Sequence, residues 1–222
     1  METIKDKIKM FIKKYYKIII IFFSILIISE MIFSILTKEV MRRDIIGYEL
    51  VSKYLISEKT LPIVKLITNF GGVAGIILIA CISSFIMFVK KKKNIGILIW
   101  INLICSALLN HVLKRLIKRP RPTGYRLIEE SGYSFPSGHS MISLAFYGFF
   151  IYLIFKNVKN KYIKYGSISL LCILILLIGI SRVYLGVHYT SDVMAGFIIS
   201  ISYLIIFTNI AKEKLNNYKE DK

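Results

Sequence analysis

A short stretch at residues 135–140, Phe-Pro-Ser-Gly-His-Ser, has the residue types needed to bind an anion. Pro136 suits the first position of a helix, and the N–H groups that follow it would point from the positive helix end toward a bound anion. Gly138 lets a ligand come close to the backbone. The Ser137 hydroxyl can donate a hydrogen bond, and His139 can deliver a proton. The stretch therefore predicts an anion site with a proton donor beside it.

A histidine and an aspartate four residues apart form a second candidate set, preceded by Ser181 and Arg182. Asp192 falls in the first turn of an expected helix, where the helix dipole favours a carboxylate, and it can reach back to the His188 imidazole. Such a carboxylate keeps one ring nitrogen protonated and leaves the other as a neutral nucleophile or base. A lone histidine near a membrane interface is more often structural. Here, however, two of the three histidines, His139 and His188, lie in these sets.

A third set is basic, with six lysines and arginines between Lys114 and Arg126. Arginine suits phosphate because its planar fork donates two parallel hydrogen bonds. Lys114 and Arg121 are seven residues apart, about two helical turns, so both can face one point if the helix continues that far. The alternative, contact with lipid headgroups, is the interpretation for the other four, which are Arg115, Lys118, Arg119 and Arg126.

The elements that must position these residues are membrane helices. The chain has 222 residues, 55% of them hydrophobic, and they come in runs long enough to cross a bilayer. Six spans are predicted, at Ile18–Leu36, Pro62–Val89, Ile95–Leu113, Ser137–Phe155, Gly166–Ser181 and Thr190–Ile210. The predicted fold class is all-α, an integral membrane bundle of six transmembrane helices. The predicted organisation is a basic cytoplasmic segment (1–17), one membrane domain (18–210) and a cytoplasmic tail (211–222).

The positive charges that give the net charge of +18 are clustered along the chain and not spread evenly. Lysines gather at 1–17, 90–93, 156–164 and 211–222, which alternating spans place on one side of the membrane. The positive-inside rule makes that side cytoplasmic, together with both termini, and this pattern argues against nucleic acid as the partner. The three candidate sets then meet on the opposite, extracytoplasmic face. The basic residues of the third set break the charge rule there, which is easier to explain if they bind an anion.

Two outer-side features leave alternatives open. The connection Thr37–Leu61 has helical periodicity and is expected to form one or two short amphipathic helices on the membrane surface. It either caps or admits a lipid substrate or is a surface linker. Glu30 and Lys65 lie at similar shallow depth in the first two spans. They either pair or reach separately to the outer interface.

Small and polar residues inside two spans predict helix packing. In the second span these residues are Asn69, Gly71, Gly72 and Gly75. In the third span, Asn102, Ser106 and Asn110 are expected to form hydrogen bonds between helices.

Taken together, the three sets resemble the three-part signature of the type 2 phosphatidic acid phosphatase (PAP2) superfamily, in its membrane lipid phosphatase branch. The matching positions are Lys114 with Arg121-Pro122, then Pro136 to His139, then Ser181-Arg182 with His188 and Asp192. The resemblance implies a fold shared with vanadium haloperoxidases and bacterial acid phosphatases, and hydrolysis of a lipid phosphate or diphosphate through a phosphohistidine.

The resemblance also implies a role for each residue. His188 would be the nucleophile, Asp192 would orient it, and His139 would carry the proton. The phosphate-binding residues would be Lys114, Arg121, Ser137, Gly138 and Arg182. No metal or other cofactor is expected, and no protein partner is identified.

An externally facing site favours undecaprenyl diphosphate as the substrate if the host is a bacterium. Phosphatidylglycerophosphate and phosphatidate are alternatives. A lipid phosphotransferase and a non-catalytic binder or transporter of anionic lipid remain the other readings, although a binder would need only the cations and not the two histidines.

Overall fold

The computed structural model describes residues 4–37 and 41–220, and every regular element in these ranges is a helix. In chain order the helices are α1 (Ile4–Leu36), α2 (Arg42–Tyr54), α3 (Leu61–Asn69), α4 (Val73–Val89), α5 (Lys93–Ile117), α6 (Gly138–Asn157), α7 (Lys161–Tyr184) and α8 (Thr190–Glu220). No strand occurs within the described ranges. The all-α prediction is confirmed.

The long helices are built to cross a bilayer. Five are long and apolar enough to do so, and α3 and α4 together make a sixth span. Their outward faces are apolar: Phe22, Phe85 and Leu170 are each more than half exposed. Such a surface suits hydrocarbon, where backbone groups must be satisfied within the helices themselves. The chain is therefore an integral membrane protein with the predicted six-span plan.

The second span is broken, whereas the sequence pattern predicted one continuous helix. α3 ends at Asn69, α4 begins at Val73, and their axes differ by 49°. A Cβ at Gly71 would lie 2.4 Å from Cγ2 of Ile178 and 2.9 Å from Oγ of Ser143, so only glycine allows this close approach to α6 and α7. Tyr147 donates from its hydroxyl to the Phe70 carbonyl oxygen, at 2.7 Å, which satisfies one carbonyl at the break.

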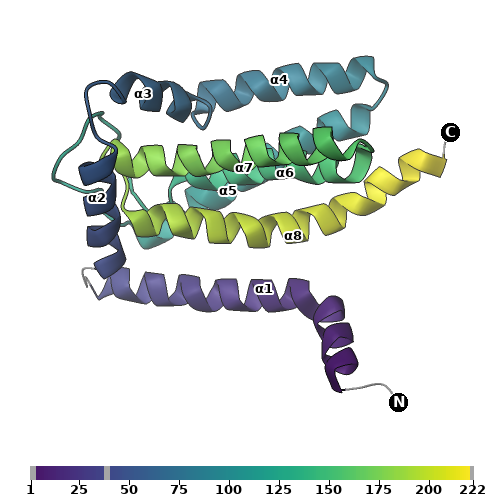
Figure 1. Cartoon of the computed structure of the whole chain (residues 1–222), viewed down its shortest axis with the longest axis horizontal. Coiled ribbons are helices and arrows are strands. Elements are labelled where there is room, and N and C mark those ends of the chain that lie inside the picture. Colours follow the sequence, from purple (N-terminus) through teal and green to yellow (C-terminus); the bar gives the residue numbers. More distant parts are fainter. Residues whose placement is uncertain (1–3, 38–40, 221–222) are drawn as a thin grey trace.

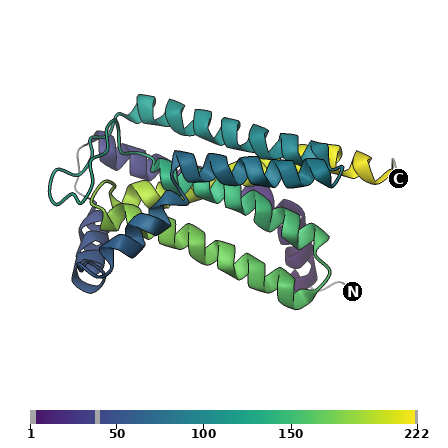
Figure 2. The ribbon, with the colours of Figure 1, turned by 90° about the horizontal axis from the view of Figure 1, so that it is seen from above.

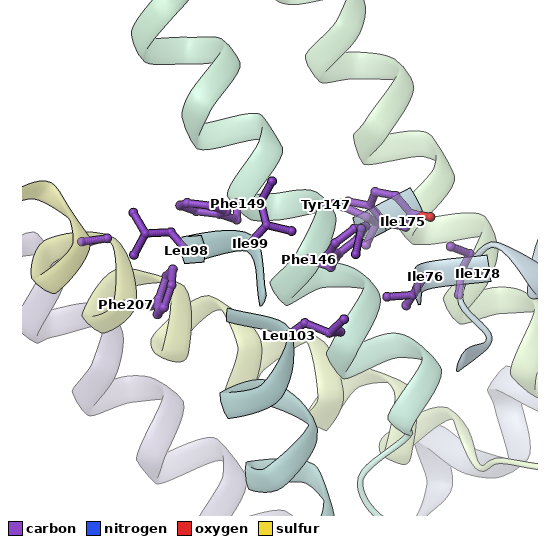
Figure 3. Close-up of a cluster of buried hydrophobic side chains, with 12 residues drawn as sticks. Ile76, Leu98, Ile99, Leu103, Phe146, Tyr147, Phe149, Ile175, Ile178 and Phe207 are labelled. Carbon is purple, nitrogen blue, oxygen red and sulfur yellow. The ribbon is translucent and has the colours of Figure 1, made fainter. Parts of the chain in front are cut away.

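The core lies where α5, α6, α7 and α8 pack together. Phe149 of α6 lies near Ile99 of α5 and packs against Phe207 of α8, whereas Phe146 lies on the side of Tyr147 and Ile76 (Figure 3). Seen from above, α4, α5 and α6 run beside one another (Figure 2). This rigid block carries the helix ends from which the candidate residues project.

The short helix α2 runs across one end of the bundle, transverse to α1 and α8 (Figure 1). The helix expected in Thr37–Leu61 is confirmed, although residues 38–40 lie outside the described ranges. Both the 90–93 turn and the α6–α7 turn lie at the opposite end of the bundle, with the C-terminal part of α8 (Figure 1).

The basic N-terminal segment is helical from Ile4 and continues into the first span. Figure 1 shows it turning away from the rest of α1. Its location in the cytoplasm stays a prediction, as do the domain boundaries at residues 17 and 210.

Polar residues inside the spans behave partly as predicted. The Asn102 side-chain amide donates to the Ala145 carbonyl oxygen of α6 at 2.8 Å, and Asn110 donates to the Pro136 carbonyl oxygen at 3.3 Å. Both residues form hydrogen bonds between elements, as expected. Ser106 instead donates to the Leu103 carbonyl oxygen in its own helix, so that prediction is wrong.

The proposed pairing of Glu30 with Lys65 is also wrong. Glu30 forms an ion pair with Arg43 of α2, with 2.6 Å between Nη2 and Oε1. Lys65 is exposed on α3. The nearby helix α2 supplies the cation: Nη2 of Arg43 donates to both carboxylate oxygens of Glu30, in place of a partner from the second span.

Candidate active site

The helix ends that carry the three sets of polar residues lie at one end of the bundle, beside α2 (Figure 1). These residues come from the C-terminal ends of α5 and α7, the N-terminal ends of α6 and α8, and the loop after α5. α5 ends at Ile117, and Lys118 has a left-handed backbone with φ of 52°. The helix therefore stops before Arg121, which reaches the site from a non-helical segment. The two-turn spacing of Lys114 and Arg121 is not what brings them together.

His188 and Asp192 form a buried pair. His188 lies in the turn between α7 and α8 and is 2% exposed, and Asp192 lies in the first turn of α8 and is wholly buried. Nδ1 of His188 is 3.3 Å from Oδ2 of Asp192, and the same oxygen accepts a 3.0 Å hydrogen bond from the Tyr189 N–H. A carboxylate in this place favours the proton on Nδ1. Nε2 is then left with a free lone pair.

Arg121 faces that lone pair. Its Nη1 lies 3.0 Å from Nε2 of His188 and donates to the Val187 carbonyl oxygen at 2.9 Å. The other guanidinium nitrogens donate to the carbonyl oxygens of Ser131 and Gly132, at 3.0 and 3.1 Å. The guanidinium fork is thereby fixed beside the nitrogen that would attack phosphorus.

The electrostatics of the site keep His188 neutral. Burial lowers the pKa of His188 to about 3, the Asp192 carboxylate opposes this fall, and the charges of Arg121 and Lys114 add to it. Burial also lowers the pKa of the Arg121 guanidinium, which nevertheless stays charged, because arginine is not deprotonated in proteins. A neutral imidazole beside a fixed cation is the state that a histidine nucleophile requires.

Arg182 and Arg121 share one carboxylate. Nη1 of Arg182 donates to Oγ1 of Thr68 at 2.8 Å, and Nη2 pairs with Glu130. Glu130 also lies 3.3 Å from Nη2 of Arg121, measured to Oε1. Within the described ranges, Nε of the buried Arg182 side chain has no hydrogen-bond partner. Two arginines therefore converge on an anionic group next to His188.

The Pro-Ser-Gly-His stretch lies at the start of α6, but the prediction for Pro136 is wrong: it precedes the N-cap and is not the first helical residue. Ser137 is the N-cap of α6, and its Oγ accepts hydrogen bonds from the Ser140 N–H and hydroxyl at 3.4 and 2.9 Å. Gly138 and His139 are the first two helical residues, whose N–H groups have no partner within the helix. These N–H groups are half-buried donors at the positive end of α6. The Ser137 oxygen, in contrast, is fully buried in the cap.

Lys114 and His139 complete the arrangement. Lys114, one turn before the end of α5, donates to the Tyr133 carbonyl oxygen and approaches Gly138. The His139 ring lies against the break between α3 and α4. In the described part of the chain no protein group hydrogen-bonds to that ring. The charges of Lys114 and Arg121 act on both His139 and His188.

The structure thus brings all eight predicted site residues together. Ser137 is tied to the pair at the start of α8, because its N–H donates to the Asp192 carbonyl oxygen at 3.0 Å. Among the described residues, no three His, Cys, Asp or Glu side chains cluster as a metal site would require. The roles of the eight residues in catalysis and binding stay predictions.

The prediction that Arg119 contacts lipid headgroups is wrong. Its side chain is buried, with Nη1 2.6 Å from Oδ1 of Asp192 and Nη2 2.8 Å from Oδ2 of Asp44. The guanidinium carbon also lies 3.9 Å from the centroid of the Tyr189 ring. A basic run in a loop gives no sign of which member turns inward, and the partner Asp44 is 75 residues away.

Glu130 and Thr68 were not singled out from the sequence either. Glu130 had a usable signal, because Glu129-Glu130 is the acidic pair in the loop between the basic set and the Pro-Ser-Gly-His stretch. Thr68 had none, since its position near Arg182 depends on the bend after α3.

A cavity of about 950 Å³ lies beside His188, which is one of its lining residues. Its walls are mostly apolar and come from the end of α1, from α2, from the loop after α5 and from the α7–α8 turn. Ile35, Ile45 and Tyr125 are among the lining residues, and Asp44 and Arg119 lie at its wall. α2 is thus more than a surface linker, since it packs over the residues that hold His188.

Comparison with known proteins identifies the same core. A family model described as the PAP2 superfamily matches residues 94–215. Phosphatidylglycerophosphatase B of Bacillus subtilis is 37% identical over 145 residues, which cover 64% of this chain and 69% of that protein. An undecaprenyl-diphosphatase of Sulfolobus acidocaldarius is 29% identical over 133 residues, covering 56% of this chain and 60% of that protein.

The whole bundle also has a solved counterpart. The crystal structure of a transmembrane PAP2 type phosphatidylglycerolphosphate phosphatase from Bacillus subtilis superposes with a TM-score of 0.74 and 26% sequence identity. The match covers 90% of this chain and 97% of that one. The similarity therefore extends beyond the 94–215 core to most of the helices that precede it.

Proposed function

The chain belongs to the PAP2 superfamily, and from that membership we propose that it is a lipid phosphatase that works through a phosphohistidine on His188. One observation carries the proposal: a buried, neutral histidine is oriented by a buried carboxylate, and its free nitrogen lies 3.0 Å from a fixed guanidinium. Nucleophile, orienting group and phosphate-binding cation are thus adjacent.

In the first step, Nε2 of His188 attacks phosphorus and the bond from phosphorus to the leaving oxygen breaks. His139, on the first turn of α6, is protonated once the bound phosphate offsets the charges of Lys114 and Arg121, and it donates that proton to the oxygen as it departs. Asp192 holds the Nδ1 proton of His188, so that positive charge developing on the imidazole is compensated. The lipid alcohol, or lipid phosphate in the case of a diphosphate, then leaves.

In the second step, water replaces the lipid. His139, now unprotonated, accepts a proton from the water as its oxygen attacks phosphorus. The bond from phosphorus to Nε2 breaks, inorganic phosphate is released, and both histidines return to their starting state.

The phosphoryl oxygens would be held by the cations and by the start of α6. Lys114, Arg121 and Arg182 supply positive charge, and the N–H groups of Gly138 and His139 donate from the helix end. Donors fixed before the reaction stabilise charge that grows in the transition state without reorganising. Ser137 would contribute mainly as the cap that sets the direction of these N–H groups.

The proposed substrate is undecaprenyl diphosphate, which would be hydrolysed to undecaprenyl phosphate. The arrangement of the bundle supports this choice: the lysine-rich turns lie at the end opposite the site (Figure 1), which under the positive-inside rule favours cytoplasmic termini and a site on the outer face. Phosphatidylglycerophosphate is the second candidate, favoured by the 37% identity to the Bacillus subtilis protein.

A phosphate-release assay tests the proposal. The protein, purified in detergent with a metal chelator present, is given undecaprenyl diphosphate, phosphatidylglycerophosphate and phosphatidate in turn. We expect release from at least one substrate, fastest from undecaprenyl diphosphate, and none with His188→Ala. Transfer to an added alcohol in place of water would indicate a phosphotransferase. Absence of release from all three substrates would contradict the proposal.

A further inference from the structure

The N-terminus of α8 is capped by a residue from another helix. Oδ1 of Asp44, on α2, accepts a 2.7 Å hydrogen bond from the Ser191 N–H, and Oδ2 accepts from the Ser191 hydroxyl at 2.9 Å. Thr190, the first residue of α8, has a buried hydroxyl with no partner in the described structure. The first turn of α8, which carries Asp192, is therefore held by α2.

Arg119 links this cap to the orienting carboxylate. Nη1 donates to Oδ1 of Asp192 and to Oγ of Ser191, at 2.6 and 2.7 Å, and Nη2 donates to Asp44. Asp192 consequently has one oxygen fixed by Arg119 and the other turned to Nδ1 of His188. The single guanidinium also separates two buried carboxylates that would otherwise repel each other.

α2 and α8 are in close contact where Gly47 faces Thr190. A Cβ at Gly47 would lie 2.1 Å from Oγ1 and 2.8 Å from Cβ of Thr190. Glycine is therefore required for α2 to come close enough for Asp44 to reach Ser191. This contact is independent of the ion pairs and leads to the same first turn of α8.

We propose that Asp44 and Arg119 are positioning residues for the reaction: they fix the Asp192 carboxylate, and through it the direction of Nε2 of His188. The inference rests on the proposed role of His188 as nucleophile. It assigns a function to α2, which lies outside the three-part signature. In the described structure the side chains of Asp44 and Arg119 form their hydrogen bonds with each other, with Ser191 and with Asp192, and not with the proposed phosphate-binding cations.

Asp44 and Arg119 would therefore affect the rate of the chemical step and not the affinity for phosphate. A carboxylate that is free to tilt lets the imidazole rotate, and an attacking nitrogen displaced by about 1 Å can cost on the order of 10²-fold in rate. The cations that hold the phosphoryl oxygens keep their own partners, so the affinity for inorganic phosphate stays unchanged.

Single-turnover measurements with enzyme in excess test the inference, because the first-order rate constant does not depend on the fraction of folded protein. Asp44→Asn places an amide donor where an acceptor faces Arg119, and Arg119→Lys keeps the charge but loses the fork. We expect each to slow lipid cleavage at least 10-fold, with the inhibition constant for inorganic phosphate within 2-fold of wild type. Ser191→Ala, a milder change, should slow cleavage a few-fold.

Comparing the double variant with the two single variants distinguishes a positioning role from a general loss of structure. Because both residues act through Asp192, Asp44→Asn combined with Arg119→Lys should be slowed far less than the product of the two single effects. Glu58→Gln, an exposed carboxylate in the α2–α3 connection, is the control and should match wild type. If Asp44→Asn does not fold, Ser191→Ala and Arg119→Lys carry the test.

Two outcomes would overturn the inference: single-turnover rates at wild-type level in Arg119→Lys and Ser191→Ala, or multiplicative effects in the double variant. His188→Ala in the same series keeps the two proposals apart. Its full activity would refute the proposed function. Its inactivity, together with wild-type rates at positions 119 and 191, would refute only the role of α2.

Discussion

The free ring nitrogen of His188 lies 3.0 Å from Nη1 of Arg121, and the same guanidinium pairs with Glu130. Arg121 therefore contacts both the proposed nucleophile and the only carboxylate that bridges two arginines in the described site. An incoming phosphoryl group would enter between them, exchanging the carboxylate for its own oxygens. The relationship leads to specific expectations for each of the three residues.

Arg121→Lys should lower kcat/KM by about 10²-fold, because it removes the fork that can hold two phosphoryl oxygens while keeping a positive charge. Steady-state phosphate release measures the effect, and the thermal midpoint in detergent reports on folding. Arg126→Lys is the matched control, since Arg126 is exposed and donates only to the Pro122 carbonyl oxygen. A change in Arg121→Lys no larger than that in the control would exclude Arg121 from the site.

Glu130→Gln should tighten the binding of inorganic phosphate by several-fold, because the carboxylate competes with phosphate for Arg121 and Arg182. The inhibition constant for phosphate measures this directly. Glu129→Gln removes an exposed neighbouring charge and serves as the control. Weaker binding in Glu130→Gln would mean that the carboxylate supports the arginines and does not compete with the anion.

Acid should destabilise the folded protein through His188. The pKa of His188 is about 3 when folded and near 6.5 in an unfolded chain. Below pH 6.5 the unfolded chain takes up a proton that the folded protein refuses, so stability falls until the pH reaches about 3. At pH 5 the loss from this group is about 2 kcal/mol.

His188→Asn removes that titration. Thermal midpoints at pH 7 and pH 5 should therefore differ less in His188→Asn than in the wild type. His111→Asn, which changes an exposed histidine at the end of α5, should behave as the wild type does. An equal acid shift in all three proteins would contradict the low pKa of His188.

Much of this architecture can be predicted from the sequence, because hydropathy and cap residues are local signals. Five spans follow directly from apolar runs, and a helix start near Pro136 was indicated, although the cap is Ser137 and the helix begins at Gly138. The break between α3 and α4 could not be predicted in the same way. The glycines signalled close packing, but the bend depends on Ile178 and Ser143, which lie more than 70 residues later.

The site shows the same division. The order and spacing of the motifs indicated Lys114, Arg121 and Arg182, which the structure brings together. Arg119 was placed among the headgroup contacts because its inward turn depends on Asp44, a residue in the segment with the weakest sequence signal. Likewise, Glu30 forms its ion pair with Arg43 of α2 and not with Lys65 of the second span. Long-range charge pairs of this kind have no periodicity in the sequence.

The most direct test of the central claim is the capture of the covalent intermediate. The protein is mixed with lipid substrate labelled in the transferred phosphoryl group and quenched in alkali, which preserves phosphohistidine. The labelled residue is then identified by peptide mapping. We expect the label on Nε2 of His188, with none in His188→Ala and wild-type labelling in His111→Ala. Label on another residue, or full turnover of His188→Ala, would contradict the account.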